Sequence, residues 1–567
     1  MALIMREIRS NKKAAVEWAF LQTKIDEICG LCYSSQVWRL CIAIVIIVQN
    51  LVKKFGERVM IRDFSHHFPR NSKIGVIGSN GAGKSTFLNI LAGIEEYDSG
   101  SVIIPKDCIL GYLPQAPCEN PKSTILKECI SGHHKLCVLD DRLQASLAKM
   151  AENYSDDVYA EYESIEKEYS DCGGYALEAN AKGILCGLGF ETSQFDKSPF
   201  SLSGGWRMRL ELAKLLINEP NFLMLDEPTN HLDLPSLIWL EQYLKSFQGT
   251  LLFVSHDRDF LNNIADQIMQ ISKGNIGTYN GNFDDFLEQR EANIETARKQ
   301  KESVKRKQDH LQEFIDRFGS KASKAKQAQS KLKTIERLKK IEERIDVDES
   351  DKKPTFKIEV EKQSAKVVLE IEDGSIGYGE NILNNGIDFK VIRGNKIAII
   401  GANGIGKTTL LKTVVGEVPI ITGKMTIGNG VSTGYYAQSQ LEVLNPNLNA
   451  LDNVLALTQN VNHQQARAIL GCLLITKDDV KKHVRILSGG EKSKVAIAAL
   501  LAQKNNFLIL DEPTNHLDMS SAEALSQALA DYDGTILVVS HNRSFISSFA
   551  THIFKMEKNK KAELICA

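Results

Sequence analysis

The sequence has 567 residues, of which 43% are hydrophobic and 25% are charged. A chain of this length is too long for one hydrophobic core, so we expect two or more domains of ordinary globular composition. The net charge of −2 gives no sign of a nucleic-acid partner by itself, although an average can conceal an uneven distribution. The eleven cysteines include one close pair, Cys29 and Cys32, without the second pair of a zinc site, which favours scattered thiols in a cytosolic protein.

Residues 1–43 carry no motif and have no clear counterpart elsewhere in the chain, so we expect a peripheral N-terminal extension. The longest apolar run, residues 40–48, has nine residues, whereas a membrane-spanning helix needs about 20. An internal repeat aligns residues 44–51 with residues 367–374. We therefore interpret the run as the first β-strand of a domain, and we expect no membrane partner.

Two glycine-rich segments, GSNGAGKS and GANGIGKT, fit the pattern G-x-x-x-x-G-K-[ST], and each follows an apolar strand. In such a loop, backbone N–H groups and the start of the following helix bind phosphate oxygens. Lys84 and Lys407 would reach the β- and γ-phosphates of a nucleotide, while Ser85 and Thr408 would bind Mg²⁺. The predicted loop residues are Gly78, Asn80, Gly81, Gly83, Lys84, Ser85 and Thr86, and Gly401, Asn403, Gly404, Gly406, Lys407, Thr408 and Thr409.

The register that superimposes Lys84 on Lys407 also relates other features of the two copies. Phe55 aligns with Tyr378, and either ring could stack on adenine; Gln115 aligns with Gln438. Beyond the glutamines the first copy is longer, and its additional residues fall within 116–200. The helical spacing of apolar residues there predicts a lengthened helical subdomain, with an arm that contacts a partner as the alternative.

Further along, the copies align again in a second constant register. LSGGWRMRL matches LSGGEKSKV, and FLMLDEPTNHLD matches FLILDEPTNHLD. Each apolar strand delivers two carboxylates to its C-terminal end, where ligands bind in α/β proteins. The aspartates, Asp226 and Asp511, could hold Mg²⁺, and the glutamates, Glu227 and Glu512, could face an attacking water. A histidine, His256 or His541, follows each glutamate at the same spacing.

This ordered set of motifs, present twice, resembles the ATP-binding cassette superfamily. The resemblance implies an α/β fold with two P-loop cassettes in tandem, residues 44–285 and 366–567, which together form an intramolecular dimer. It also implies that the LSGG segment of each cassette closes over ATP bound by the other. One site would combine Lys84, Ser85, Gln115, Asp226, Glu227 and His256 with Ser488, Gly489 and Gly490; the other would combine Lys407, Thr408, Gln438, Asp511, Glu512 and His541 with Ser203, Gly204 and Gly205.

The resemblance also implies a role for each residue type. The glutamates would polarise the attacking water, the histidines would sense the γ-phosphate, and Asp233 and Asp518 would couple the two sites. Because neither site lacks a key residue, we expect both to hydrolyse ATP. The implied Mg²⁺ ligands are Ser85, Gln115 and Asp226 in the first site and Thr408, Gln438 and Asp511 in the second.

The segment between the cassettes, residues 286–365, has a different composition. From Arg298 to Lys340 it contains 15 Lys or Arg and five Asp or Glu, a net charge of +10. Near-heptad spacing of apolar residues predicts two long helices, with Gly319-Ser320 as the turn of a hairpin. A solvated charged linker is the simpler interpretation, whereas a slender basic tip could follow a phosphate backbone. The candidate RNA contacts are Arg317, Lys321, Lys324, Lys326, Lys331 and Lys333.

Two fused cassettes joined by a basic helical hairpin resemble the ABC-F family of translation factors. The linker LQEFIDRFGSKASKAKQAQSKLK and Trp206 resemble the bacterial YheS-like branch. The resemblance implies a cytoplasmic monomer that binds the ribosome at the tRNA exit site, with its linker near peptidyl-tRNA and the peptidyl-transferase centre. Alternatives are antibiotic resistance by ribosome protection, the ATPase subunit of a membrane transporter, and a DNA-repair ATPase.

Overall fold

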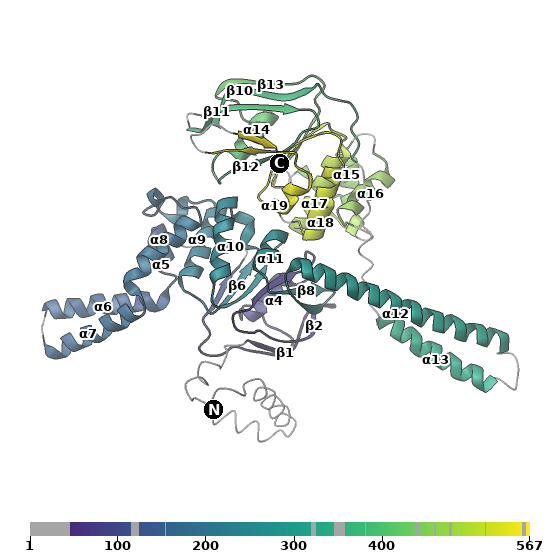
Figure 1. Ribbon diagram of the computed structural model, residues 1–567, viewed down its shortest axis with the longest axis horizontal. Helices are drawn as coiled ribbons and strands as arrows, with labels where there is room; N and C mark the ends of the chain where they lie inside the picture. The colour runs from purple at the N-terminus through teal and green to yellow at the C-terminus, as the bar shows by residue number, and fades with distance from the viewer. Residues whose placement is uncertain are drawn as a thin grey trace.

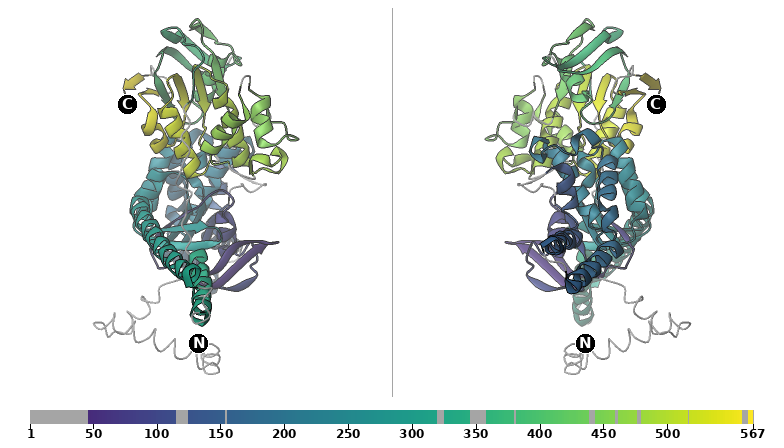
Figure 2. Two further views of the ribbon diagram at one scale, coloured as in Figure 1. Left: turned by 90° about the vertical axis from the view of Figure 1, so that its right-hand side faces the viewer. Right: turned by 90° about the vertical axis from the view of Figure 1, so that its left-hand side faces the viewer.

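The structure, a computed structural model, is shown in Figures 1 and 2. Two cassettes lie one above the other, and two helical hairpins project to opposite sides of the first cassette. Among the described residues, no helix has both the length and the apolar composition needed to cross a bilayer. The described residues are 46–114, 124–152, 155–318, 325–344, 358–379, 381–437, 443–458, 461–475, 479–515, 517–557 and 563–566.

The first cassette is built on a six-stranded sheet with the order β5-β6-β7-β3-β8-β9. Its strands are parallel except for the antiparallel pair β8 and β9. A separate antiparallel sheet has the order β2-β1-β4. The strands are β1 Ile47–Phe55, β2 Arg58–His67, β3 Lys73–Ile77, β4 Ser99–Ile103, β5 Leu110–Leu113, β6 Phe222–Asp226, β7 Thr250–Val254, β8 Gln267–Ser272 and β9 Asn275–Asn280.

The second cassette repeats this architecture strand for strand, with sheet orders β14-β15-β16-β12-β17-β18 and β11-β10-β13. The structure therefore confirms the expected tandem α/β fold. β1 and β10 end at Phe55 and Tyr378, which are aligned positions of the repeat. The strands are β10 Val367–Tyr378, β11 Asn381–Ile392, β12 Lys396–Ile400, β13 Thr422–Ile427, β14 Thr433–Tyr436, β15 Phe507–Asp511, β16 Thr535–Val539, β17 His552–Lys555 and β18 Glu563–Cys566.

The central strands are apolar at successive positions because both faces of each sheet are covered. In β6, Leu223 and Leu225 pack against one core that includes helices α8 to α10, while Phe222 and Met224 pack against α4 and the antiparallel sheet. All five residues of β6 are buried. The helices of the first cassette are α4 Lys84–Leu91, α5 Ile125–Ile130, α6 His134–Glu152, α7 Asp156–Asp171, α8 Leu177–Gly187, α9 Gly204–Ile217, α10 Leu234–Ser246 and α11 Arg258–Ile264.

The additional residues of the first copy contain α6 and α7, which pack against each other and extend away from the cassette (Figure 1). The second cassette contains α14 Lys407–Val415, α15 Ala450–Ala456, α16 His463–Cys472, α17 Gly489–Ala502, α18 Met519–Ala530 and α19 Arg543–Phe549.

The segment between the cassettes is a long helical hairpin of α12 (Phe283–Phe318) and α13 (Ala325–Arg344). Val304, Leu311 and Ile315 on α12 are half-buried at the predicted heptad positions, and Ile335 on α13 is buried. The Gln308 amide donates a hydrogen bond of 2.9 Å to Glu342 on the other helix. The predicted turn at Gly319-Ser320 lies outside the described residues.

Candidate active sites between the cassettes

Each P-loop connects a central strand to a helix, β3 to α4 in the first cassette and β12 to α14 in the second. Gly83 and Gly406 precede the helices with φ angles of 104° and 99°, a conformation that favours glycine. The buried Nζ atoms of Lys84 and Lys407 donate across the loop to the carbonyl oxygens of Gly78 (2.8 Å) and Gly401 (2.7 Å). Burial lowers the pKa of both lysines, although nearby carboxylates oppose the shift. Both ammonium groups therefore lie inside the loops where the phosphates of a nucleotide would bind.

The paired carboxylates follow β6 and β15, and one strand separates each of these from the P-loop strand of its sheet. Glu227 and Glu512 adopt left-handed backbone conformations, with φ angles of 52° and 46°. Such a conformation costs a non-glycine residue about 1 kcal/mol or more and is common at functional sites. Their N–H groups donate to the carbonyl oxygens of Val254 (3.0 Å) and Val539 (2.9 Å) on the intervening strand, which holds both turns.

The carboxylates and hydroxyls beside each P-loop fit a Mg²⁺ site. Asp226 and Asp511 are buried, and burial raises the pKa of each, while the neighbouring hydroxyls of Ser85 and Thr408 oppose that rise. Oδ1 of either aspartate has no hydrogen-bond partner of good geometry among the described residues. Because Mg²⁺ at a nucleotide site takes few protein ligands besides phosphate and water, one carboxylate and one hydroxyl suffice. The other predicted ligands, Gln115 and Gln438, lie outside the described residues.

The predicted histidines lie beside the glutamates in both copies. Nε2 of His256 is 3.1 Å from Oε1 of Glu227, and Nε2 of His541 is 3.3 Å from Oε1 of Glu512. Asn230 adds a 2.5 Å hydrogen bond to Glu227. These short contacts connect the residue expected to face water with the residue expected to sense phosphate.

The two glutamates differ in charge state. Burial tends to raise the pKa of Glu227, but His256, Asn230 and Lys84 outweigh it and lower the pKa to about 2. Burial and the charge of Asp511 raise the pKa of Glu512 to about 8. Burial, with a contribution from Lys407, lowers the pKa of His541 to about 3, so this histidine is neutral at pH 7. The same sequence motif therefore has two electrostatic environments.

The second P-loop faces the first cassette across a shared cavity of about 430 Å³. The predicted LSGG residues Ser203 and Gly205, at the start of α9, line it from one side. The backbone N–H of Asn403 donates a hydrogen bond of 2.8 Å to Oδ2 of Asp233, which joins the cassettes directly. From the second cassette, the cavity is lined by Leu383, Asn403, Gly404, Gly406, Lys407, Thr408, Thr409, Asp511, Glu512, Asn515, Val539 and His541.

The first P-loop has a related environment. Burial lowers the pKa of Lys84, while the charge of Asp518 from the second cassette raises it and that of Lys494 lowers it, so this part of the second cassette lies near the first P-loop. Ser488, Gly489 and Gly490 form the start of α17, as Ser203, Gly204 and Gly205 form the start of α9.

Sequence reasoning missed one buried cation on each of these helices. Arg209 lies 3.7 Å from Asp233, and Lys494 lies 3.1 Å from Asp518. The repeat contained the signal, because both positions are basic when the LSGG segments are aligned. Each cation holds the aspartate that faces the opposite cassette.

The predicted adenine platforms lie on the antiparallel sheets. Phe55 pairs with Arg58 on the neighbouring strand. The Arg58 guanidinium donates a hydrogen bond of 2.9 Å to the carbonyl oxygen of Gly81 in the P-loop. Tyr378 pairs with Asn381 at the equivalent turn. Both rings are about half exposed, at 50% and 53%, so each has a face available for stacking beside a P-loop.

Comparisons with known proteins agree with this geometry. A family model described as ABC transporter matches residues 61–230 and 384–515, and a second model with the same description matches residues 269–358. The putative ATP-binding protein YdiF of Bacillus subtilis is 39% identical over 91% of this chain and 81% of its own length. The probable ATP-binding protein YheS of Escherichia coli K12 is 36% identical over 91% and 79%. The chain belongs to the ABC-F family of tandem ATP-binding cassette proteins.

Solved structures show the same fold for this ABC-F protein. A crystal structure titled as the complex of archaeal ribosomal stalk protein aP1 and archaeal ribosome recycling factor aABCE1 matches with a TM-score of 0.52 and 20% identity. The match covers 91% of this chain and 89% of the chain in that structure. A structure titled RNase-L Inhibitor matches equally well. These likenesses concern the tandem-cassette fold alone.

Four of the six candidate RNA contacts of this ABC-F protein lie on α12 and α13. Lys333 is exposed and Lys331 is half-buried on α13, whereas Lys321 and Lys324 lie outside the described residues. Arg317 and Lys326 lie on the helices near the predicted turn.

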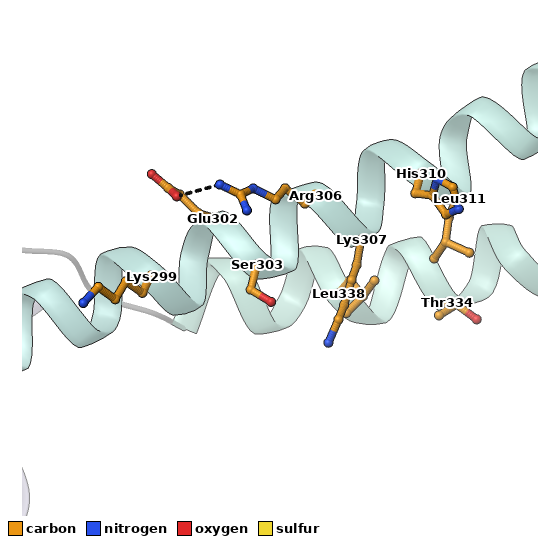
Figure 3. Close-up of a pocket in the computed structure, with 9 residues that line it drawn as sticks. All are labelled: Lys299, Glu302, Ser303, Arg306, Lys307, His310, Leu311, Thr334 and Leu338. Carbon is orange, nitrogen blue, oxygen red and sulfur yellow. Dashed lines mark hydrogen bonds and ion pairs between the residues drawn. The ribbon is translucent and has the colours of Figure 1, made fainter.

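A groove of about 800 Å³ runs along the hairpin (Figure 3). Its basic lining residues come from α12, and one of them, Arg306, is paired with Glu302 at 3.4 Å. The groove is lined by Lys299, Glu302, Ser303, Arg306, Lys307, His310, Leu311, Thr334 and Leu338.

Proposed function

We propose that this protein is a cytoplasmic ATPase that converts ATP and water to ADP and phosphate at two sites shared by its cassettes. The cavity that joins the Lys407 loop to Ser203 and Gly205 carries this proposal, because a nucleotide bound there would contact both cassettes at once. ATP binding would thus draw the cassettes together, and loss of the γ-phosphate would release them.

The chemistry at each site follows from the placement of its side chains. The P-loop N–H groups and lysine neutralise the phosphates, while the glutamate orients water towards the γ-phosphate. His256 or His541, within 3.3 Å of that glutamate, stabilises its orientation. Bound by Ser85 and Asp226, or by Thr408 and Asp511, Mg²⁺ would supply positive charge to the phosphate oxygens.

We further propose that the ribosome is the partner, with the cassettes at the tRNA exit site and the hairpin directed at peptidyl-tRNA and the peptidyl-transferase centre. The net charge of +10 on residues 298–340 of the hairpin, within a chain of net −2, supports an RNA partner for this element. The groove of Figure 3 adds three basic residues of α12, which are Lys299, Arg306 and Lys307. Lysine is suited to backbone contacts, so we expect recognition of RNA shape and charge rather than base sequence.

Charge removal on the hairpin tests the RNA proposal. Lys307→Gln with Lys333→Gln should weaken ribosome association and reduce its salt dependence, by a log–log slope of about 0.7–0.9 per lost phosphate contact. Adding Lys321→Gln, Lys324→Gln and Lys326→Gln should deepen the loss while basal ATPase activity is largely retained. Ribosome co-sedimentation across a salt series measures both the affinity and the slope.

The matched control changes two exposed lysines of the second cassette, Lys366→Gln and Lys424→Gln, which alter net charge equally. Equal losses in the hairpin and control variants would rule out the hairpin as the RNA contact. A collapse of basal ATPase activity in the hairpin variant would instead indicate a structural role.

A further inference from the structure

The two LSGG helices begin with the same Ser-Gly-Gly but differ at the next residue, where α9 has Trp206 and α17 has Glu491. The start of an α-helix presents unpaired N–H groups and a positive dipole, which attract one anion. In the composite sites that anion would be the γ-phosphate of ATP. The residue at this position therefore bears directly on nucleotide binding.

Glu491 folds its own carboxylate back onto the start of α17. The backbone N–H and the hydroxyl of Ser488 both donate to Oε2 of Glu491, each at 2.8 Å. In return, the Glu491 N–H donates to Oγ of Ser488 at 3.3 Å. The serine donors that would face a γ-phosphate are thus already engaged by an internal anion.

The start of α9 is different. Ser203 makes no side-chain capping bond, and Trp206 turns its ring against Phe190, with ring centroids 4.9 Å apart. The Arg209 guanidinium lies 4.5 Å from the same ring. Ser203 and Gly205 line the cavity shared with the Lys407 loop, and no carboxylate of their own helix is bound to the serine.

We propose that the Glu491 carboxylate competes with the γ-phosphate of ATP for Ser488 at the site that contains Lys84. The two sites therefore differ in their affinity for ATP. ATP at Lys84 must displace the carboxylate from Ser488, and the displaced charge remains near the phosphate. At the site that contains Lys407, no carboxylate of α9 competes with the γ-phosphate of ATP for Ser203. The Lys407 site therefore binds ATP more tightly and closes first. This inference rests on the proposed binding of ATP at the composite sites.

Glu491→Gln tests the competition, because glutamine keeps an oxygen for Ser488 and removes the charge. The full chain carries Lys407→Ala and Glu227→Gln, so that only the Lys84 site binds nucleotide and hydrolysis is blocked. Equilibrium binding of radiolabelled ATP and ADP is then measured with and without Glu491→Gln. We expect roughly a tenfold gain in ATP affinity and little change for ADP, which has no γ-phosphate to compete.

Trp206→Glu is the reciprocal variant, placed in a chain with Lys84→Ala and Glu512→Gln. It should weaken ATP binding at the Lys407 site by a similar factor, again without affecting ADP. It also keeps the proposal testable if Glu491→Gln fails to fold, which a thermal melt would reveal.

The results of these binding measurements distinguish a failure of the Glu491 competition from a failure of the proposed function. Equal changes in ATP and ADP affinity, or no change for either, would overturn the competition while leaving ATP binding intact. Failure of both parent chains to bind ATP would instead overturn the proposed function itself.

Discussion

Glu227 and Glu512 occupy aligned positions, yet their surroundings give them opposite charge behaviour. Glu227 accepts a hydrogen bond from Asn230 and lies beside His256, and its pKa falls to about 2. Burial and the adjacent Asp511 raise the pKa of Glu512 to about 8. The first glutamate is ionised throughout the physiological range, whereas the second is mostly protonated at pH 7 in the free protein.

This difference predicts unequal pH profiles for the two sites. A carboxylate that orients water must be ionised, so kcat/KM of the Lys407 site should rise about tenfold between pH 7 and pH 9 as Glu512 loses its proton. The Lys84 site should show no such rise, because Glu227 is already ionised. In steady-state assays, the ATPase activity of Glu227→Gln measures hydrolysis at the Lys407 site, and that of Glu512→Gln measures hydrolysis at the Lys84 site. Parallel profiles would contradict the assignment.

Among the helices and strands, those that carry a short motif could be predicted from the sequence. The P-loop and the DEPTNHLD strand need only local residues, so repetition alone revealed them. The cation on each LSGG helix was missed because Arg209 and Lys494 pair with the aspartates that end the DEPTNHLD motifs, a contact that no local pattern encodes. Helix α12 begins at Phe283, where Asn282 accepts hydrogen bonds from the N–H groups of Asp284 and Asp285 at 2.9 and 3.0 Å.

That helix start is tied to the loop that carries His256. Arg258, which follows the histidine closely in the chain, donates to Oδ1 of Asp284 at 2.7 and 3.1 Å, and Asn262 donates to Oδ2 at 3.0 Å. Asp284 therefore links the proposed phosphate sensor to the hairpin. The pair is exposed, so its contribution to stability is small, about 1 kcal/mol or less.

We predict that Asp284→Ala uncouples the hairpin from the Lys84 site. Basal ATPase activity should persist, while its stimulation by ribosomes should fall several-fold. ATPase assays with and without ribosomes measure the ratio. Glu288→Ala, an exposed acidic residue one turn further along α12, is the matched control and should retain the stimulation. If ribosomes stimulate the ATPase activity of Asp284→Ala as strongly as that of the unaltered protein, Asp284 does not couple the hairpin to the Lys84 site.

Across the whole molecule, one ion pair between the cassettes lacks a counterpart related by their pseudo-symmetry. Arg543 on α19 of the second cassette binds the buried Glu241 of the first and lies 4.0 Å from Asp259. The aligned positions of Glu241 and Asp259 are Ser526 and Ser544, so the reciprocal bridge cannot form. Arg258, the counterpart of Arg543, binds the hairpin instead. Sequence alone could not place this contact, because its partners lie in different cassettes, far apart in the chain.

Arg543→Ala should loosen the contact between the cassettes, since it leaves the Glu241 carboxylate buried without its cation, at a cost of about 1–3 kcal/mol. Pulsed dipolar spectroscopy between a spin label on each cassette should then show a broader distance distribution in the nucleotide-free protein. Arg258→Ala changes the aligned arginine and should leave that distribution narrow. Identical distributions in both variants would mean that this ion pair does not hold the cassettes.

We propose that ATP closes the two cassettes and that the closed form is the one that binds ribosomes. Glu227→Gln with Glu512→Gln removes the two carboxylates proposed to orient water and keeps their size, so the double variant should remain closed on ATP. In co-sedimentation, it should accompany ribosomes in ATP but not in ADP, and it should block protein synthesis in a cell-free system. Ribosome association that is absent in ATP, or equal in ATP and ADP, would show that ATP-driven closure does not control ribosome binding.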